Sequence, residues 1–293
     1  MTNDIVRNHP AGSTSRKQKV IRAIGFSPRS LWPSLRELRE YGDLIFTLSV
    51  HRIKVRYKQS ALGISWAILQ PLSLMVIYTA LFSRVAKIPS DNVPYTIFAF
   101  AGLLPWTYFQ SVLSNSTNAL VGHSSLITKV YFPREILPLT YVIAGLFDFL
   151  IASSILIVMM IYYRVPLTAN VFYTIPLIVV LTLFGCSMAL LLSASQVRFR
   201  DFGVAIPLLL QIWMFATPVV YPLSSISALP DNVQRIYLLN PMVGIIENFR
   251  RVVVRGLPPD FHLLSMSALV AVVVLPMAYL YFKRVVATAA DII

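Results

Sequence analysis

Six long apolar segments, separated by short polar stretches, dominate the chain after residue 61. Each is long enough to cross a bilayer core, which takes a helix of roughly 20 residues. Prolines interrupt several of them, and a helical bundle tolerates this because neighbouring helices can satisfy the freed carbonyls. The pattern predicts an all-α polytopic membrane protein with six transmembrane helices, at about 62–82, 95–112, 136–163, 171–194, 203–220 and 263–282.

An amphipathic segment precedes the first span. Between residues 35 and 58, apolar side chains recur at helical spacing and a strongly basic part follows. This predicts a helix in the cytoplasmic interface of the membrane; a solvated juxtamembrane linker is the alternative. Its cations could attract anionic lipid headgroups at a cytoplasmic entry, and the candidates are Arg52, Lys54, Arg56 and Lys58. Residues 1–33 are expected to form a flexible basic cytoplasmic tail, and 34–293 a single transmembrane domain.

The stretch 126–139, LITKVYFPREILPL, interrupts the apolar pattern between the second and third spans. Its charged side chains are too costly to place in lipid without partners. Leu126, Ile127 and Val130 share one side of a short helix, and Pro133 stands at the start of the next span, where its missing N–H costs least. We expect a short cytoplasmic helix and turn on which a partner protein acts.

Residues 221–258 form a second interruption, on the opposite side of the membrane. Within it, 242–255 reads as an amphipathic helix whose 14 residues rise only about 21 Å, and Asn240–Pro241 breaks the chain before it. Glu247, Arg250 and Arg251 lie mostly on the face opposite its apolar residues. We expect two short helices that dip into the outer leaflet, buried against protein, as an outer gate; an ordinary extracellular loop with a surface helix is the alternative.

Composition and charge agree with a membrane protein. The chain is 57% hydrophobic and 13% charged, against about 25% charged in a soluble domain. The net charge of +13 would suggest nucleic acid in a soluble protein, but 18 of the 25 basic residues fall on the side of the N-terminus in the six-span topology. The positive-inside rule then predicts that both termini are cytoplasmic.

Motifs for chemistry are scarce. The sequence has no GxxxxGK[ST] loop, no nucleophile motif and no metal-ligand spacing, and its one cysteine is Cys186. We therefore expect no catalytic residue, metal or cofactor on this chain. The intramembrane Asp148 either lines a hydrophilic path or serves as a structural hydrogen-bonding residue. Aromatic rings stack on sugars but also anchor helices at membrane interfaces; the remaining pathway candidates are Trp106, Tyr108, Phe109, Trp213, Phe215 and Tyr221.

Five segments, in order along the chain, resemble the permease subunits of bacterial ABC exporters for polysaccharides and related polymers, of the Wzm, KpsM and TarG types. The segments are 56–72 (RYKQSALGISWAILQPL), 129–138 (KVYFPREILP), 196–201 (QVRFRD), 217–222 (TPVVYP) and 239–250 (LNPMVGIIENFR). The basic N-terminal tail has no counterpart in that pattern.

The resemblance implies an inner-membrane homodimer that moves a lipid-linked polysaccharide such as O antigen, capsule or a teichoic-acid-like polymer. Two copies of a separate P-loop ATPase, with ATP and Mg²⁺, would supply the energy. The coupling residues would be Leu126, Lys129, Val130, Tyr131, Phe132, Pro133, Arg134 and Glu135, and the outer-gate residues Asn240, Pro241, Glu247, Arg250 and Arg251. The alternatives are an intramembrane enzyme or a secondary transporter acting on lipid-linked sugars.

Overall fold

The computed structural model describes residues 38–58, 60–85, 87, 93–228 and 230–289. The expected tail, 1–33, and the first residues of the expected interface helix lie outside this range. Within it the regular secondary structure is all helical, with no strand. The helices are α2 (Gly42–Lys58), α3 (Trp66–Tyr78) with a π-helical extension (Thr79–Val85), α4 (Tyr95–Thr117), α5 (Ser124–Lys129), α6 (Ile136–Tyr162), α7 (Thr174–Arg198), α8 (Phe202–Phe215), α9 (Asp231–Leu238), α10 (Pro241–Val253) and α11 (Phe261–Ala289).

Five of the described helices are long and apolar enough to cross a membrane, which confirms the all-α membrane fold. They cover Gly63–Val85, Tyr95–Thr117, Ile136–Tyr162, Ala169–Arg198 and Phe261–Ala287. The expected fifth span, 203–220, differs from the structure. Its helix α8 has 14 residues, a rise of about 21 Å, and the rest of the segment turns between residues 216 and 221.

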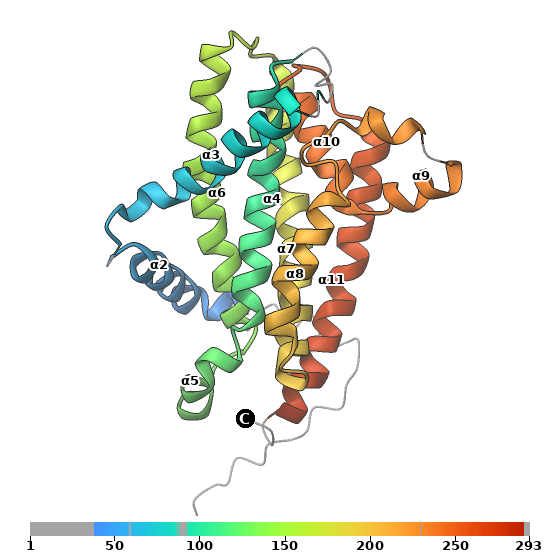
Figure 1. Ribbon diagram of the computed structural model, residues 1–293. Helices are drawn as coiled ribbons and strands as arrows, with labels where there is room; N and C mark the ends of the chain where they lie inside the picture. The colour runs from blue at the N-terminus through green and yellow to red at the C-terminus, as the bar shows by residue number, and fades with distance from the viewer. Residues whose placement is uncertain (1–37, 59, 86, 88–92, 229, 290–293) are drawn as a thin grey trace, which may run out of the picture.

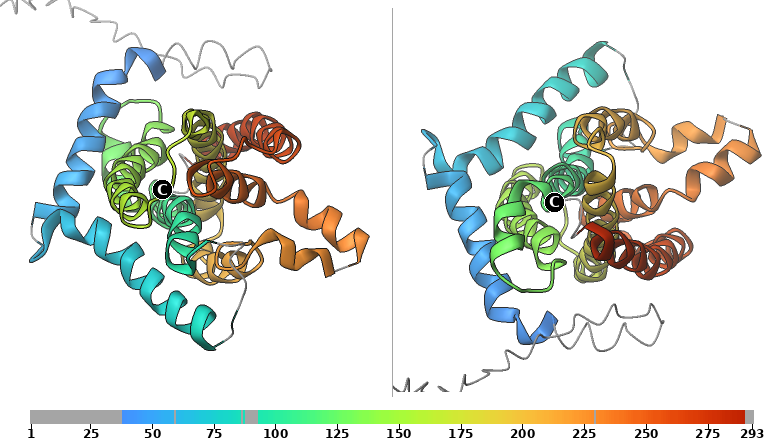
Figure 2. Two further views of the ribbon diagram at one scale, coloured as in Figure 1. Left: turned by 90° about the horizontal axis from the view of Figure 1, so that it is seen from above. Right: turned by 90° about the horizontal axis from the view of Figure 1, so that it is seen from below.

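Helix α4 occupies the centre of the bundle. In the 18 most apolar residues of α4, 78% are buried, against 11% for the span that contains α3. Helices α3, α6, α7, α8 and α10 pack around it, as the views along the bundle show (Figure 2). The outward faces of the peripheral helices are apolar and exposed, for example Val76 on α3, Val158 on α6 and Val272 on α11. In a membrane these faces can meet lipid without cost.

The two ends of the bundle carry different short helices. Helices α2 and α5 lie at the end where α11 finishes, and α2 crosses the bundle against α6 (Figure 1). At the other end, α9 projects sideways while α10 is inserted among α4, α7 and α11 (Figures 1 and 2). The predicted interface helix and the predicted pair of short outer helices are therefore both present as helices, at opposite ends.

Candidate transport pathway and coupling site

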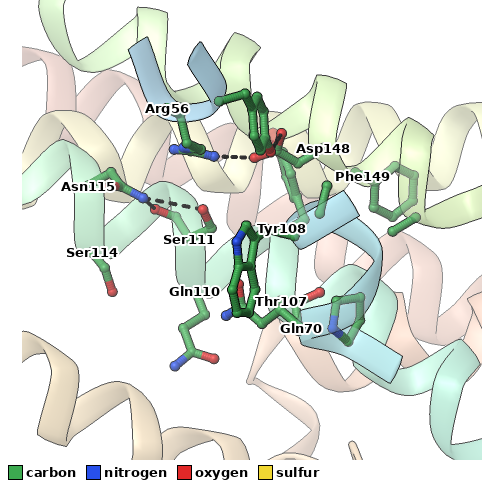
Figure 3. A pocket seen from close by; sticks show the side chains of 16 residues that line it. Arg56, Gln70, Thr107, Tyr108, Gln110, Ser111, Ser114, Asn115, Asp148 and Phe149 are labelled. Atoms are coloured by element: carbon green, nitrogen blue, oxygen red, sulfur yellow. Dashed lines mark hydrogen bonds and ion pairs between the residues drawn. The ribbon is translucent and has the colours of Figure 1, made fainter. Parts of the chain in front are cut away.

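A cavity of about 410 Å³ opens between α2, α3, α4 and α6 (Figure 3). Its wall combines amide and hydroxyl side chains with aromatic rings, a mixture that can hydrogen-bond sugar hydroxyls and stack on sugar faces. The polar lining residues are Arg56, Gln70, Thr107, Gln110, Ser111, Ser114, Asn115 and Asp148, and the aromatic ones are Tyr57, Trp66, Tyr108 and Phe149.

Asp148 lies in the wall of this cavity and is bonded to α2. It forms an ion pair with Arg56 and accepts a hydrogen bond of 2.6 Å from the Tyr57 hydroxyl. Burial, and then the hydrogen bond to Asp148, raise the pKa of Tyr57 to about 12, so this phenol stays protonated and donates at neutral pH. Asp148 thus makes structural contacts that hold α2 against α6, and it also lines a polar cavity; its place on a transport path stays a prediction.

The most polar wall of the cavity comes from α4. Gln110, Ser111, Ser114 and Asn115 follow one another at i, i+1, i+4 and i+5, a spacing that places them on one face of a helix. The Asn115 amide donates to the Ser111 carbonyl at 2.6 Å. The sequence analysis did not identify these residues: it ended the span at 112, which separated Gln110 and Ser111 from Ser114 and Asn115. The signal that could have found them is a helical-period polar stripe in the last two turns of an apolar span.

The aromatic pathway candidates have different surroundings. Trp106 and Phe109 are fully buried and pack with Trp213 and Phe184 between α4, α7 and α8. These rings form the bundle core and do not line the cavity. Phe215 is 46% exposed at the end of α8, and the Tyr221 hydroxyl donates to its carbonyl at 2.8 Å. Of the six aromatic candidates, Tyr108 lines the cavity.

The four basic entry candidates on α2 fall into two pairs with different surroundings. The Arg52 guanidinium lies 3.6 Å from the centre of the Tyr141 ring and donates to the Thr140 hydroxyl at 2.5 Å; burial lowers the pKa of this guanidinium from its usual value. Arg56 is paired with Asp148. Lys54 and Lys58 are exposed. Arg52 and Arg56 therefore fasten α2 to α6, and the two lysines face outward.

The coupling segment has a buried side and an exposed side. Leu126 and Ile127 on α5 pack into a small core with Phe132, which is 6% exposed. The chain leaves α5 after Lys129 and is extended at Val130. Val130 was expected on the same side of the helix as Leu126 and Ile127, but it lies beyond the end of α5 and is 52% exposed, and Tyr131 is 85% exposed. The exposed surface of this segment is therefore centred on Tyr131 and flanked by Lys129 and Val130.

The two charged residues that follow turn inward to the end of α11. Arg134 donates to the Val286 carbonyl at 3.0 Å. Glu135 is 2% exposed; it pairs with Lys283 and accepts a hydrogen bond of 3.0 Å from Tyr279. Helix α6 begins at Ile136, so Pro133 precedes it by three residues rather than standing in its first turn. The loop between α5 and α6 is thus fastened to α11.

At the other end, Arg250 is enclosed by backbone carbonyls. It is fully buried and lies 3.9 Å from the centre of the Phe98 ring. Its guanidinium donates to the carbonyls of Pro218 (2.7 Å), Val219, Tyr221 (3.4 Å) and Phe98 (3.2 Å). The sequence places Arg250 on the face of α10 opposite its apolar residues, and this part of that face is buried because the turns at 216–221 fold over Arg250 and use its donors. Of the charged residues on α10, Arg251 is only partly buried.

The two ends of α10 are defined by polar contacts. Asn240 caps it by accepting from the Met242 N–H at 3.1 Å and donates to the Thr217 hydroxyl at 2.9 Å, while Pro241 occupies the first helical position, where it is favoured. Glu247 lies 3.4 Å from the Arg255 guanidinium. The buried surroundings of α10 favour the interpretation of 241–253 as inserted rather than as a surface helix.

Comparison with known proteins adds the family. Residues 43–254 match the ABC-2 type transporter family. The chain belongs to this family. It is 34% identical over 243 residues to an O-antigen export system permease protein RfbA from Myxococcus xanthus, covering 82% of this chain and 92% of the relative. It is 29% identical to an RfbA from Klebsiella pneumoniae (73% and 81%), and 25% identical to a polysialic acid transport protein KpsM from Escherichia coli (71% and 80%).

The ABC-2 match runs from α2 to the end of α10 and ends before α11. It therefore includes the cavity, the coupling segment and the Arg250 contacts. The α11 residues that bind Arg134 and Glu135 lie outside it.

A methyl group at Gly102 is expected to destabilise this ABC-2 protein. In Gly102→Ala, the new Cβ would clash with Arg250 Nη2 and with the Val219 carbonyl oxygen. Overpacking of this kind typically costs about 1–3 kcal/mol. Thermal unfolding of the purified protein should show a lower midpoint for Gly102→Ala and an unchanged one for Gly42→Ala, whose Cβ would meet nothing within 4 Å. Equal midpoints would contradict the tight packing at Gly102.

Proposed function

We propose that this protein is the membrane subunit of an ATP-driven exporter that moves a lipid-linked polysaccharide across the bacterial inner membrane. It would act as a homodimer with two copies of a separate P-loop ATPase, and both termini would face the cytoplasm. The observation that carries the proposal is the polar and aromatic cavity, placed next to the basic helix α2 in a protein whose relatives are permeases for O antigen and polysialic acid.

The cavity has the properties that a path for a sugar polymer needs. Its hydroxyl and amide groups can exchange hydrogen bonds with successive sugar units without holding any one of them tightly. Lys54 and Lys58 are exposed on α2, beside Tyr57 in the cavity wall. Cations in this position can attract the phosphate groups of a lipid carrier, so the charged end and the sugar end of one substrate would meet different parts of the same entrance.

The energy would enter at the exposed part of the coupling segment. Tyr131 is among the most exposed aromatic side chains described, at 85%, and it follows directly on α5. An aromatic ring with this exposure can anchor an interface by filling a pocket on a partner. Because Arg134 and Glu135 bind α11, a force applied to Tyr131 would reach both α6 and α11.

The test uses the permease purified with its partner ATPase and the lipid-linked polysaccharide extracted from the source cells. The polysaccharide is expected to stimulate ATP hydrolysis. Ser111→Leu places an apolar side chain in the cavity and should lower this stimulation by about tenfold, the factor that corresponds to 1.4 kcal/mol of lost binding.

The matched control is Ser154→Leu, an exposed serine on α6, which should retain the stimulation. Both variants should still bind the ATPase. Equal stimulation of ATP hydrolysis in the Ser111→Leu variant and in the unaltered complex would show that the cavity is not part of the transport path. A complex that never responds to any lipid-linked polysaccharide would contradict the proposed function itself.

A further inference from the structure

The charges inside the cavity cancel. Of its 16 lining residues, Arg56 and Asp148 are the ionised ones, and they form an ion pair with each other. Figure 3 shows the two side chains facing one another at one edge of the cavity, with Asn115 and Ser111 beside them on α4. The remaining polar groups are neutral amides and hydroxyls.

We infer that the cavity selects uncharged sugar units, bearing hydroxyl or acetamido groups, and that Asp148 sets this selection by neutralising Arg56. This inference rests on the proposed function and goes further, because it names the class of sugar and the residue that discriminates.

The paired arrangement gives an anionic sugar little to bind. A carboxylate on a sugar needs an unpaired cation or several aligned donors to replace its hydration. Here the Arg56 guanidinium donates through Nη1 to the Asp148 carboxylate, so its charge is already paired, and the Tyr57 hydroxyl donates to the same carboxylate. A second carboxylate in the cavity would approach Asp148 and be repelled, since like charges side by side are strongly unfavourable.

A neutral sugar meets the opposite situation. The Gln70, Gln110 and Asn115 side chains each carry an amide that both donates and accepts, as a sugar hydroxyl or acetamido group does. The rings of Trp66 and Tyr108 add flat apolar surface on which the C–H face of a sugar can pack. None of these contacts requires the Arg56–Asp148 pair to open.

The test measures binding of two soluble probes to the full chain in lipid nanodiscs. Chitotetraose is neutral and carries acetamido groups, and tetragalacturonic acid is its anionic counterpart. Saturation-transfer NMR should show that the unaltered protein prefers chitotetraose by at least about tenfold, the direction that like-charge repulsion dictates. Ser111→Leu should abolish this binding, which places it in the cavity.

Substitutions of Arg56 and Asp148 then test whether their ion pair causes the preference for the neutral probe. Asp148→Asn leaves Arg56 without its carboxylate and should reduce the preference by about tenfold or reverse it. The double variant Arg56→Gln with Asp148→Asn removes both charges and should regain the preference for chitotetraose. The probe preference measured on the unaltered protein tests the inference even if a variant fails to fold.

Equal or tighter binding of tetragalacturonic acid to the unaltered protein would overturn the inference, and so would binding of neither probe. Because no ATPase is present, a failure of coupling cannot produce either outcome. If the complex exports in an ATP-driven manner but the cavity prefers the anionic probe, the inference about charge selection is wrong and the proposed function stands.

Discussion

Replacing Arg250 by methionine is expected to lower the free energy of unfolding by about 3–5 kcal/mol, the usual cost of removing one side of a buried charged contact. The side chain is fully buried and supplies hydrogen bonds to four backbone carbonyls on two segments. Methionine has a similar length but no donors. The carbonyls of the turns at 216–221 would then be left without partners in the interior of the bundle, where each such group is costly.

The neighbouring residue provides the matched control. Arg251 lies on the same helix, is only partly buried, and donates to the Pro258 carbonyl at 2.6 Å. The midpoint of thermal unfolding of the purified protein should be lower by roughly 10 °C for Arg250→Met, given about 2–4 °C per kcal/mol for a chain of this size. For Arg251→Met the midpoint should fall by much less. Equal shifts for the two variants would show that the turns at 216–221 do not depend on Arg250.

The second large effect is expected at the contact between Glu135 and Lys283. Glu135 is almost completely buried, and its carboxylate is held by Lys283 and Tyr279. Glu135→Lys would place two cations together and release the loop between α5 and α6 from α11. Because the lysine side chain is 31% exposed, solvent weakens the pair, and we expect a coupling free energy of about 1.4 kcal/mol, or tenfold in transport.

A double-mutant cycle separates this contact from general damage to the fold. Glu135→Lys and Lys283→Glu should each lower export per ATP hydrolysed, and the combined charge swap should recover part of it. Tyr279→Phe removes a single hydrogen bond and should have a smaller effect in the same direction. If the swap is no better than the worse single variant, and ATP hydrolysis and export fall together in all of them, the pair holds the structure but does not transmit force.

The long helices could be predicted from the sequence because an apolar run of that length has few alternatives in a bilayer. The third span was predicted at 136–163 and is observed as α6 over Ile136–Tyr162. The fifth was predicted to end at 220, five residues beyond the end of α8 at Phe215. The sequence remains apolar past Phe215, but the chain turns at Pro218, where Arg250 binds the backbone carbonyls.

The sites were predictable only in part. The coupling segment stood out because its charges interrupt an apolar pattern, and its exposed Tyr131 was within it. The partners of Arg134 and Glu135 lie about 150 residues further along the chain, and no local pattern could identify them. For the same reason the sequence did not show which carbonyls Arg250 binds. The polar stripe from Ser111 to Asn115 is visible in the sequence. An uncharged polar stripe at the end of a span, however, looks the same as the usual polar end of a transmembrane helix.

The central claim is that this permease moves a lipid-linked polysaccharide with energy received from a partner at the coupling segment. The most direct measurement is ATP-dependent translocation of the extracted polysaccharide into sealed vesicles that contain the permease and its ATPase. Translocation should require ATP and the ATPase, and should fall about tenfold in Tyr131→Ala, the loss expected for an exposed anchor side chain worth about 1.4 kcal/mol. Tyr162→Ala, at the opposite end of α6 and 78% exposed, should translocate normally. Translocation that proceeds without the ATPase, or that is unaffected by Tyr131→Ala, would contradict the claim.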